Sequence, residues 1–108
     1  MTCRFVKHWN QDEQRTEYWM TAYEYDDGID RLAEFFIERF AMCLIERFTG
    51  MYSNRLVLQG ENTVYTLLWH EDVGNYLYSE PQSEEMLREL EERLNAFVEY
   101  AAIHYGDD

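Results

Sequence analysis

Two stretches with helical periodicity enclose a run of strand-like segments, and this order constrains the fold more than any other feature of the sequence. Between Ile29 and Phe40, apolar side chains recur at intervals of three and four residues, the spacing of an amphipathic helix. A second helix is predicted from Ser83, a typical N-cap residue, with an apolar stripe that reaches Ala101. Because four strand-like segments lie between these helices, strands and helices do not alternate strictly, and we predict an α+β fold.

Six segments have strand character, bounded by polar or glycine-containing turns. They are 3–9, 15–25, 42–48, 54–59, 63–70 and 76–79. We predict an antiparallel sheet of four to six strands with two amphipathic helices packed on one face, in the order β-β-α-β-β-β-β-α. The chain has 108 residues, no internal repeat and no Pro/Gly-rich linker, so we expect a single acidic globular domain, 1–108.

The chain is acidic, but it is also rich in aromatic residues. It has 22 Asp and Glu against 9 Lys and Arg, a net charge of −13 and 17% aromatic residues. Disordered acidic chains are poor in aromatic residues, so this composition favours a globular protein. Direct binding to nucleic acid or to an anionic membrane is not expected, because the basic residues are few and scattered.

The cellular location is inferred from the absence of two kinds of apolar segment and from the number of cysteines. No apolar run approaches the length of a transmembrane helix, and the segment 1–8 lacks the apolar region of a signal peptide. The two cysteines, Cys3 and Cys43, are too few for a disulfide framework. We therefore expect a cytoplasmic protein with reduced thiols. Cys43 has apolar neighbours and is predicted to be buried.

No known catalytic motif occurs in the sequence. The three histidines lack a second His or Cys at metal-ligand spacing. The run His70-Glu71-Asp72 could offer an imidazole and two carboxylates to a divalent ion, and a solvated turn is the simpler interpretation. We predict no enzymatic activity, no cofactor and no metal.

Carboxylates form a row on the predicted C-terminal helix, opposite its apolar stripe, at about 100° per residue. The row comprises Glu85, Glu89, Glu92 and Glu99, and a second acidic cluster comprises Asp12, Glu13, Glu17, Glu24, Asp26, Asp27 and Asp30. The first hypothesis is an inhibitor or decoy whose acidic face occupies a basic nucleic-acid-binding site on a partner protein. Glu85, Glu89, Glu92 and Glu99 would carry the contact, supported by Asp26 and Asp27. A merely solvated acidic helix face explains the same residues.

The average charge density decides what this first hypothesis requires. The net charge corresponds to about one charge per ~500 Å² of expected folded surface. B-DNA carries about one per ~100 Å². Nucleic-acid mimicry therefore requires that folding gather the helix row and the second acidic cluster on one face.

The alternative hypothesis is a protein–protein interaction module that acts through an aromatic sheet face. Tyr and Trp are enriched at interfaces, and the candidate residues are Trp19, Tyr23, Tyr25 and Phe35. Such a module could be an immunity protein, a secretion-type chaperone or an adaptor, and a homodimer is one form it could take. A tyrosine-rich core and rim would also account for these residues.

In outline, the small acidic α+β chain resembles type III secretion chaperones and small phage or mobile-element inhibitor proteins. The chaperones generally begin with a helix, which this sequence lacks. No motif carries either resemblance.

Overall fold

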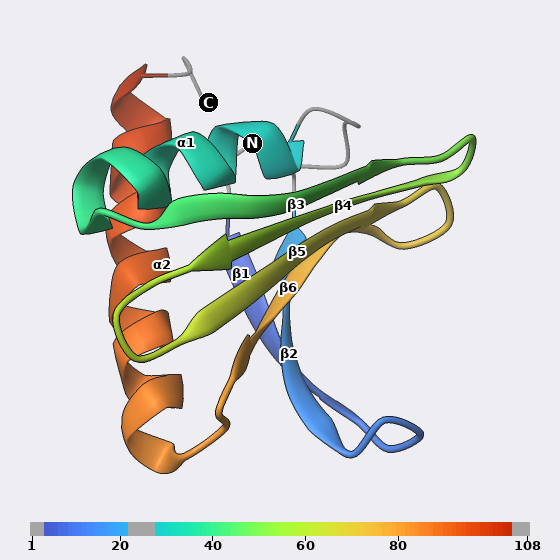
Figure 1. The fold of residues 1–108 in the computed structure, drawn as a ribbon, viewed down its shortest axis with the longest axis horizontal. Coiled ribbons are helices and arrows are strands. Elements are labelled where there is room, and N and C mark those ends of the chain that lie inside the picture. Colours follow the sequence, from blue (N-terminus) through green and yellow to red (C-terminus); the bar gives the residue numbers. More distant parts are fainter. Residues whose placement is uncertain (1–3, 22–27, 105–108) are drawn as a thin grey trace.

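Six strands form one antiparallel sheet, and two helices pack on one face of it (Figure 1). The computed structural model describes residues 4–21 and 28–104. The elements in chain order are β1 (Arg4–Asn10), β2 (Arg15–Thr21), α1 (Gly28–Phe40), β3 (Cys43–Thr49), β4 (Ser53–Gln59), β5 (Val64–His70), β6 (Gly74–Glu80) and α2 (Glu84–His104). The predicted α+β class and element order are confirmed.

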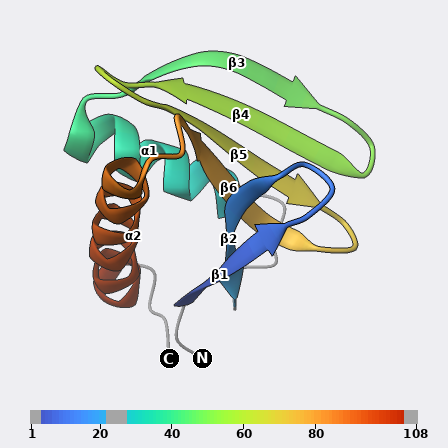
Figure 2. The same cartoon turned by 90° about the horizontal axis from the view of Figure 1, so that it is seen from below.

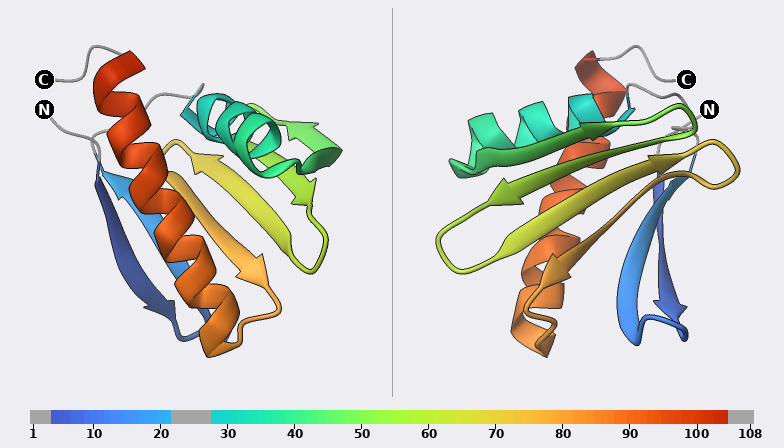
Figure 3. Two further views of the ribbon diagram at one scale, coloured as in Figure 1. Left: turned by 90° about the vertical axis from the view of Figure 1, so that its left-hand side faces the viewer. Right: turned by 45° about the vertical axis from the view of Figure 1, so that its right-hand side comes forward.

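The strand order in the sheet is β1-β2-β6-β5-β4-β3. The N-terminal hairpin therefore lies beside β6, which is the last strand in sequence. The sheet curves around the helices (Figure 2). Helix α1 contacts β3, β4, β5 and β6, whereas α2 contacts β6 and runs past the N-terminal hairpin (Figure 3). No helix among the described residues is long and apolar enough to cross a membrane.

The core lies between the helices and the concave face of the sheet. Its largest fully buried side chains are Tyr18, Ile29, Leu32, Phe36, Leu56, Leu58, Tyr65, Leu67, Leu77, Leu90, Leu94 and Phe97. The strand members alternate with residues on the other face, as the pleat requires. Two layers thus form one apolar core, and the opposite face of the sheet carries neither helix.

Phe35 is buried, which corrects the prediction that it lies on an exposed interface. It is only 3% exposed. Its ring centroid lies 5.3 Å from that of Phe97 and 5.1 Å from that of Tyr100, both on α2. The helical periodicity identified the side of α1 that faces the sheet. It did not reveal that a second side of α1 packs against α2.

Cys43 is exposed, so the prediction of a buried cysteine is wrong. It begins β3, an edge strand that is exposed along its whole length. Its neighbour Leu44 is 40% exposed and Ile45 is 57% exposed. Apolar neighbours in sequence indicated burial, but position at the sheet edge decides exposure.

The last strand is longer than the sequence indicated. We predicted 76–79, but β6 begins at Gly74, which pairs with His70 of β5. Gly74 has φ 95°, a left-handed conformation that glycine adopts without steric cost. The connection between β5 and β6 is therefore shorter than the five-residue turn that its polar residues suggested.

Candidate functional site

The face of the sheet opposite the helices carries an aromatic cluster where the N-terminal hairpin, β1 and β2, pairs with β6. Trp19 of β2 lies directly opposite Val6 of β1 and Tyr76 of β6, and directly opposed residues share a face. The preceding residue, Tyr18, is fully buried, and its hydroxyl donates a hydrogen bond to Glu91 of α2. Trp19 therefore points away from the helices. We call this side of the sheet the outer face.

Trp19 is the centre of the cluster. Its ring centroid lies 4.5 Å from that of His8 and 6.4 Å from that of Tyr76. It remains 36% exposed, although this large ring lies on a middle strand of the sheet. A half-exposed Trp flanked by two further rings has the composition of an interface centre.

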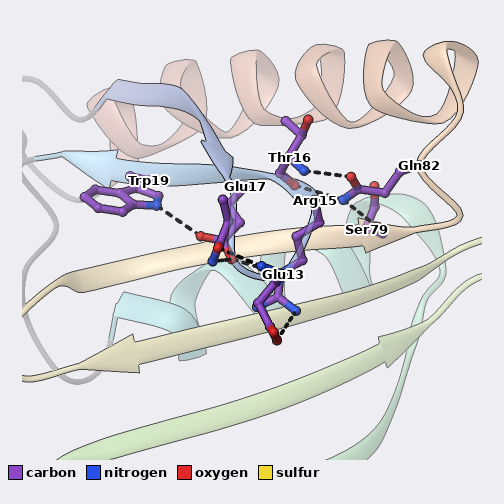
Figure 4. Close-up of polar contacts among 8 residues, drawn as sticks. Glu13, Arg15, Thr16, Glu17, Trp19, Ser79 and Gln82 are labelled. Atoms are coloured by element: carbon purple, nitrogen blue, oxygen red, sulfur yellow. Dashed lines mark hydrogen bonds and ion pairs between the residues drawn. The ribbon is translucent and has the colours of Figure 1, made fainter.

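A buried carboxylate lies beside these rings. Glu17 is only 2% exposed, although it also points to the outer face, opposite His8. Its Oε2 accepts hydrogen bonds from Asn10 Nδ2 at 3.0 Å and from Arg15 Nε at 2.9 Å. Its Oε1 faces Trp19 Nε1, which donates at the long distance of 3.4 Å (Figure 4). The two carboxylate oxygens therefore differ: Oε2 accepts two hydrogen bonds of ordinary length, whereas Oε1 accepts one long, weak hydrogen bond.

Arg15 compensates the buried charge of Glu17. Its guanidinium carbon lies 3.7 Å from the ring centroid of Tyr78, so the cation stacks on an aromatic face while it bonds the carboxylate. It also approaches Glu13, with 3.8 Å between Nη1 and Oε1. Burial of a carboxylate is tolerated when a cation and hydrogen bonds accompany it.

Burial raises the pKa of the Tyr76 phenol, and the nearby negative charge of Glu17 raises it further, while Arg15 opposes the shift. Tyr76 is therefore neutral at physiological pH and can serve as a ring surface and a hydrogen-bonding hydroxyl.

A hollow of about 540 Å³ opens beside the carboxylate. Its walls include His8, Glu17, Trp19 and Tyr76, and Asp12 of the β1–β2 turn also lines it. We call it the Glu17 pocket. Its volume lies in the range of small-ligand sites, and its lining of rings and carboxylates suits a cationic or hydrogen-bond-donating group.

Of the four residues predicted for the aromatic interface, the structure describes two and exposes one. Trp19 is exposed, whereas Phe35 is buried between α1 and α2. Tyr23 and Tyr25 lie outside the described residues. Glu17 was missed as a separate site residue, because it was grouped with the second acidic cluster. The one available signal was its spacing in Arg15-Thr16-Glu17-Tyr18-Trp19, which places a cation, an anion and an indole on one face of a strand.

The predicted acidic row lies on α2, and its members are not equivalent. Glu85, Glu92 and Glu99 are exposed. Glu89 is half-buried and pairs with Arg93, with 3.0 Å between Nη2 and Oε1. The exposed part of the row thus consists of these three glutamates.

The second acidic cluster is dispersed over the described part of the chain. Glu17 is buried on the outer face, and Asp30 of α1 pairs with Arg47 of β3 at 3.0 Å. Asp26 and Asp27 fall outside the described residues. Within the described residues, the α2 row and these carboxylates therefore do not form one acidic face.

His70 serves the turn between β5 and β6. Its Nδ1 accepts a hydrogen bond from the backbone N–H of Asp72 at 3.0 Å. Across residues 4–21 and 28–104, no three His, Cys, Asp or Glu side chains form a group that could hold a metal ion.

Comparison with known proteins adds no likeness from which a function could be transferred. No protein-family model, no curated protein sequence and no solved structure matches the chain.

Proposed function

We propose that the protein is a non-enzymatic binding protein that recognises a partner protein through its outer face, with Trp19 at the centre of the contact. The observation that carries the proposal is the arrangement of Trp19, His8 and Tyr76 around the Glu17 pocket, on a sheet face without helices. Aromatic residues in such positions supply a large share of the energy of protein–protein contacts.

A preformed site supports this interpretation further. Glu17 is fixed by Asn10 and Arg15, and Arg15 is fixed by Tyr78. Side chains already held in place lose little entropy when a partner binds, which favours affinity. The carboxylate adds directionality to a contact that rings alone would leave unspecific.

A second candidate function is a decoy for a basic site that relies on the α2 row alone, without the gathered acidic face that full nucleic-acid mimicry requires. It is supported by the exposure of Glu85, Glu92 and Glu99. These carboxylates would pair with Lys and Arg side chains of a nucleic-acid-binding protein. Such a complex would form quickly and weaken strongly with salt.

One experiment separates the two candidates. The immobilised protein is used to isolate its partner, and the complex is washed from about 0.1 M to about 1 M NaCl, over which the Debye length falls from about 10 to about 3 Å. Trp19→Ala is compared with a triple variant that changes Glu85, Glu92 and Glu99 to Lys. We expect Trp19→Ala to abolish a complex that survives high salt, while the triple variant retains it.

The converse result supports the decoy. Loss of the complex in the triple variant and at high salt, with Trp19→Ala intact, would contradict binding through the outer face. Retention by both variants would contradict both candidates.

A further inference from the structure

The Glu17 carboxylate has two sides, and the protein itself fills one of them with an arginine. On that side, Arg15 Nε donates to Oε2 at 2.9 Å, and its guanidinium stacks on Tyr78. This pair of contacts, an N–H to a carboxylate and a planar cation on a ring, is a favourable environment for a guanidinium group.

The other side of the carboxylate, toward the Glu17 pocket, has the same two elements: a carboxylate oxygen and aromatic rings. Oε1 contacts the Trp19 indole, and Glu17, Trp19 and Tyr76 all line the pocket, with His8 against the indole. In the hydrogen bonds that the described residues make, Oε1 accepts only the 3.4 Å contact from Trp19. A carboxylate oxygen has capacity for a further and shorter bond. This side thus has a buried carboxylate at the wall of a pocket that aromatic rings also line.

The charge around the pocket favours a cation. Asp12 lines it, Glu13 lies beside Arg15, and Glu17 is at its wall. Arg15 is the cation among these four charged groups, so the pocket surroundings are net negative. The whole chain, at −13, adds a long-range field of the same sign.

We propose that the Glu17 pocket binds an arginine side chain of the partner protein, with the guanidinium against Trp19 and an N–H donated to Glu17 Oε1. This rests on the proposed function and names the group that the outer face recognises. Arginine fits better than a quaternary ammonium, which has no N–H for the carboxylate. It fits better than lysine, whose compact ammonium is strongly hydrated and does not stack as a plane.

The test uses N-acetyl-arginine amide as the probe and follows the Trp19 indole Nε1–H in ¹H–¹⁵N spectra, with Trp19→Phe identifying the signal. N-acetyl-citrulline amide has nearly the same shape without the charge, so it is the matched control ligand. We expect a saturable shift of the Trp19 signal with the arginine compound. The citrulline compound should bind at least about tenfold more weakly, a factor that corresponds to 1.4 kcal/mol. Equal binding of the two compounds would overturn the proposal.

Two variants that each remove one negative charge locate the site. Glu17→Gln should weaken arginine binding about tenfold or more, since a hydrogen bond to a charged group is lost. Glu92→Gln on α2 should leave it unchanged. Equal effects of the two substitutions would show a diffuse attraction to an acidic surface and would overturn the pocket. The citrulline comparison needs no variant, so it decides the matter even if Glu17→Gln unfolds.

The outcome also separates this inference from the proposed function. If Trp19→Ala abolishes the partner complex while arginine and citrulline compounds bind equally or not at all, the outer face is the interface and the arginine assignment is wrong. If the arginine compound shifts the Trp19 signal while Trp19→Ala still binds the partner, the pocket binds a guanidinium group, but the proposed partner contact through the outer face is wrong.

Discussion

The phenol of Tyr18 donates a 2.6 Å hydrogen bond to Oε2 of Glu91 and so joins β2 to α2. Lys7 of β1 approaches the same oxygen at 3.2 Å. The strand that holds Glu17 and Trp19 on the outer face is thereby fixed to a helix on the inner face. Alternation along β2 therefore links the stability of the core to the position of the candidate site.

Tyr18→Phe should destabilise the protein by about 1–2 kcal/mol, because the hydrogen bond to a charged group is lost and the ring remains. Urea unfolding measures the change. Tyr52→Phe is the matched control, since Tyr52 is 58% exposed and exposed substitutions cost less than about 0.5 kcal/mol. Equal losses for the two variants would show that the Tyr18 hydroxyl contributes nothing.

The same contact predicts how stability depends on pH. The hydrogen bond from Tyr18, opposed by burial and aided by Lys7, lowers the pKa of Glu91. A carboxyl group with a lowered folded pKa contributes stability above its unfolded pKa of about 4.3, and this is lost as pH falls through the folded value. The stability advantage of the natural chain over Glu91→Gln should thus be full at pH 7 and shrink below about pH 4.3.

A second pair of variants tests the cause of that pH dependence. In the Tyr18→Phe background, Glu91→Gln should produce a smaller change between neutral and acidic pH, because the largest source of the lowered pKa is absent. Unfolding curves at several pH values measure it. An unchanged pH dependence in that background would assign the effect to other carboxylates.

Hydrophobic periodicity was sufficient for the fold class and element order because both helices and the strands β2, β4, β5 and β6 bury apolar side chains in one core. Three residues of the apolar stripe on α2, Leu90, Leu94 and Ala101, are fully buried as the stripe predicted. Periodicity could not predict the packing of the helices against each other, so it misplaced Phe35. It also could not say which strand forms the sheet edge, which is why Cys43 was misassigned.

The candidate site was less predictable, since it depends on strand pairing. Trp19 could be proposed from composition and alternation. The pairing of β2 with β6, distant in sequence, brings Tyr76 and Tyr78 to Trp19 and Arg15. Charge counts also treat Glu17 as one acid among 22, whereas its burial sets it apart.

Phe35→Ala should cost about 3–5 kcal/mol, the range for truncation of a buried Phe. The variant loses the ring contacts with Phe97 and Tyr100 that hold α1 against α2. Phe48→Ala is the comparison, because Phe48 is 48% exposed, and its loss should stay below about 1 kcal/mol. If Phe35→Ala unfolds the chain, Phe35→Leu should give a smaller, measurable loss in urea. Similar values for Phe35→Leu and Phe48→Leu would contradict the buried position.

Gln82 completes the edge of the β2–β6 pairing with its side chain. Its Oε1 accepts from Thr16 N at 2.7 Å, and its Nε2 donates to Thr16 O at 2.9 Å and to Ser79 O at 3.1 Å (Figure 4). Gln82→Ala should cost about 1–3 kcal/mol, because buried backbone groups lose their partners. Gln82→Glu should be at least as harmful at pH 7, since a carboxylate would face two carbonyl oxygens. Amide hydrogen exchange at Thr16 should accelerate in both variants, and unchanged exchange would contradict the contact.

Gly28→Ala should destabilise the protein even though alanine is the better helix former. A Cβ at Gly28 would overlap the side-chain amide nitrogen of Asn75 and lie 2.8 Å from its Cγ. Asn75 is 3% exposed on β6, so it has little room to yield. Overpacking of this kind costs about 1–3 kcal/mol, which exceeds the gain of about 1 kcal/mol in helix propensity. In a double-mutant cycle followed by urea unfolding, Gly28→Ala should cost less in an Asn75→Ala background. Equal cost in both backgrounds would show that Asn75 is not the obstacle and that α1 does not begin against β6.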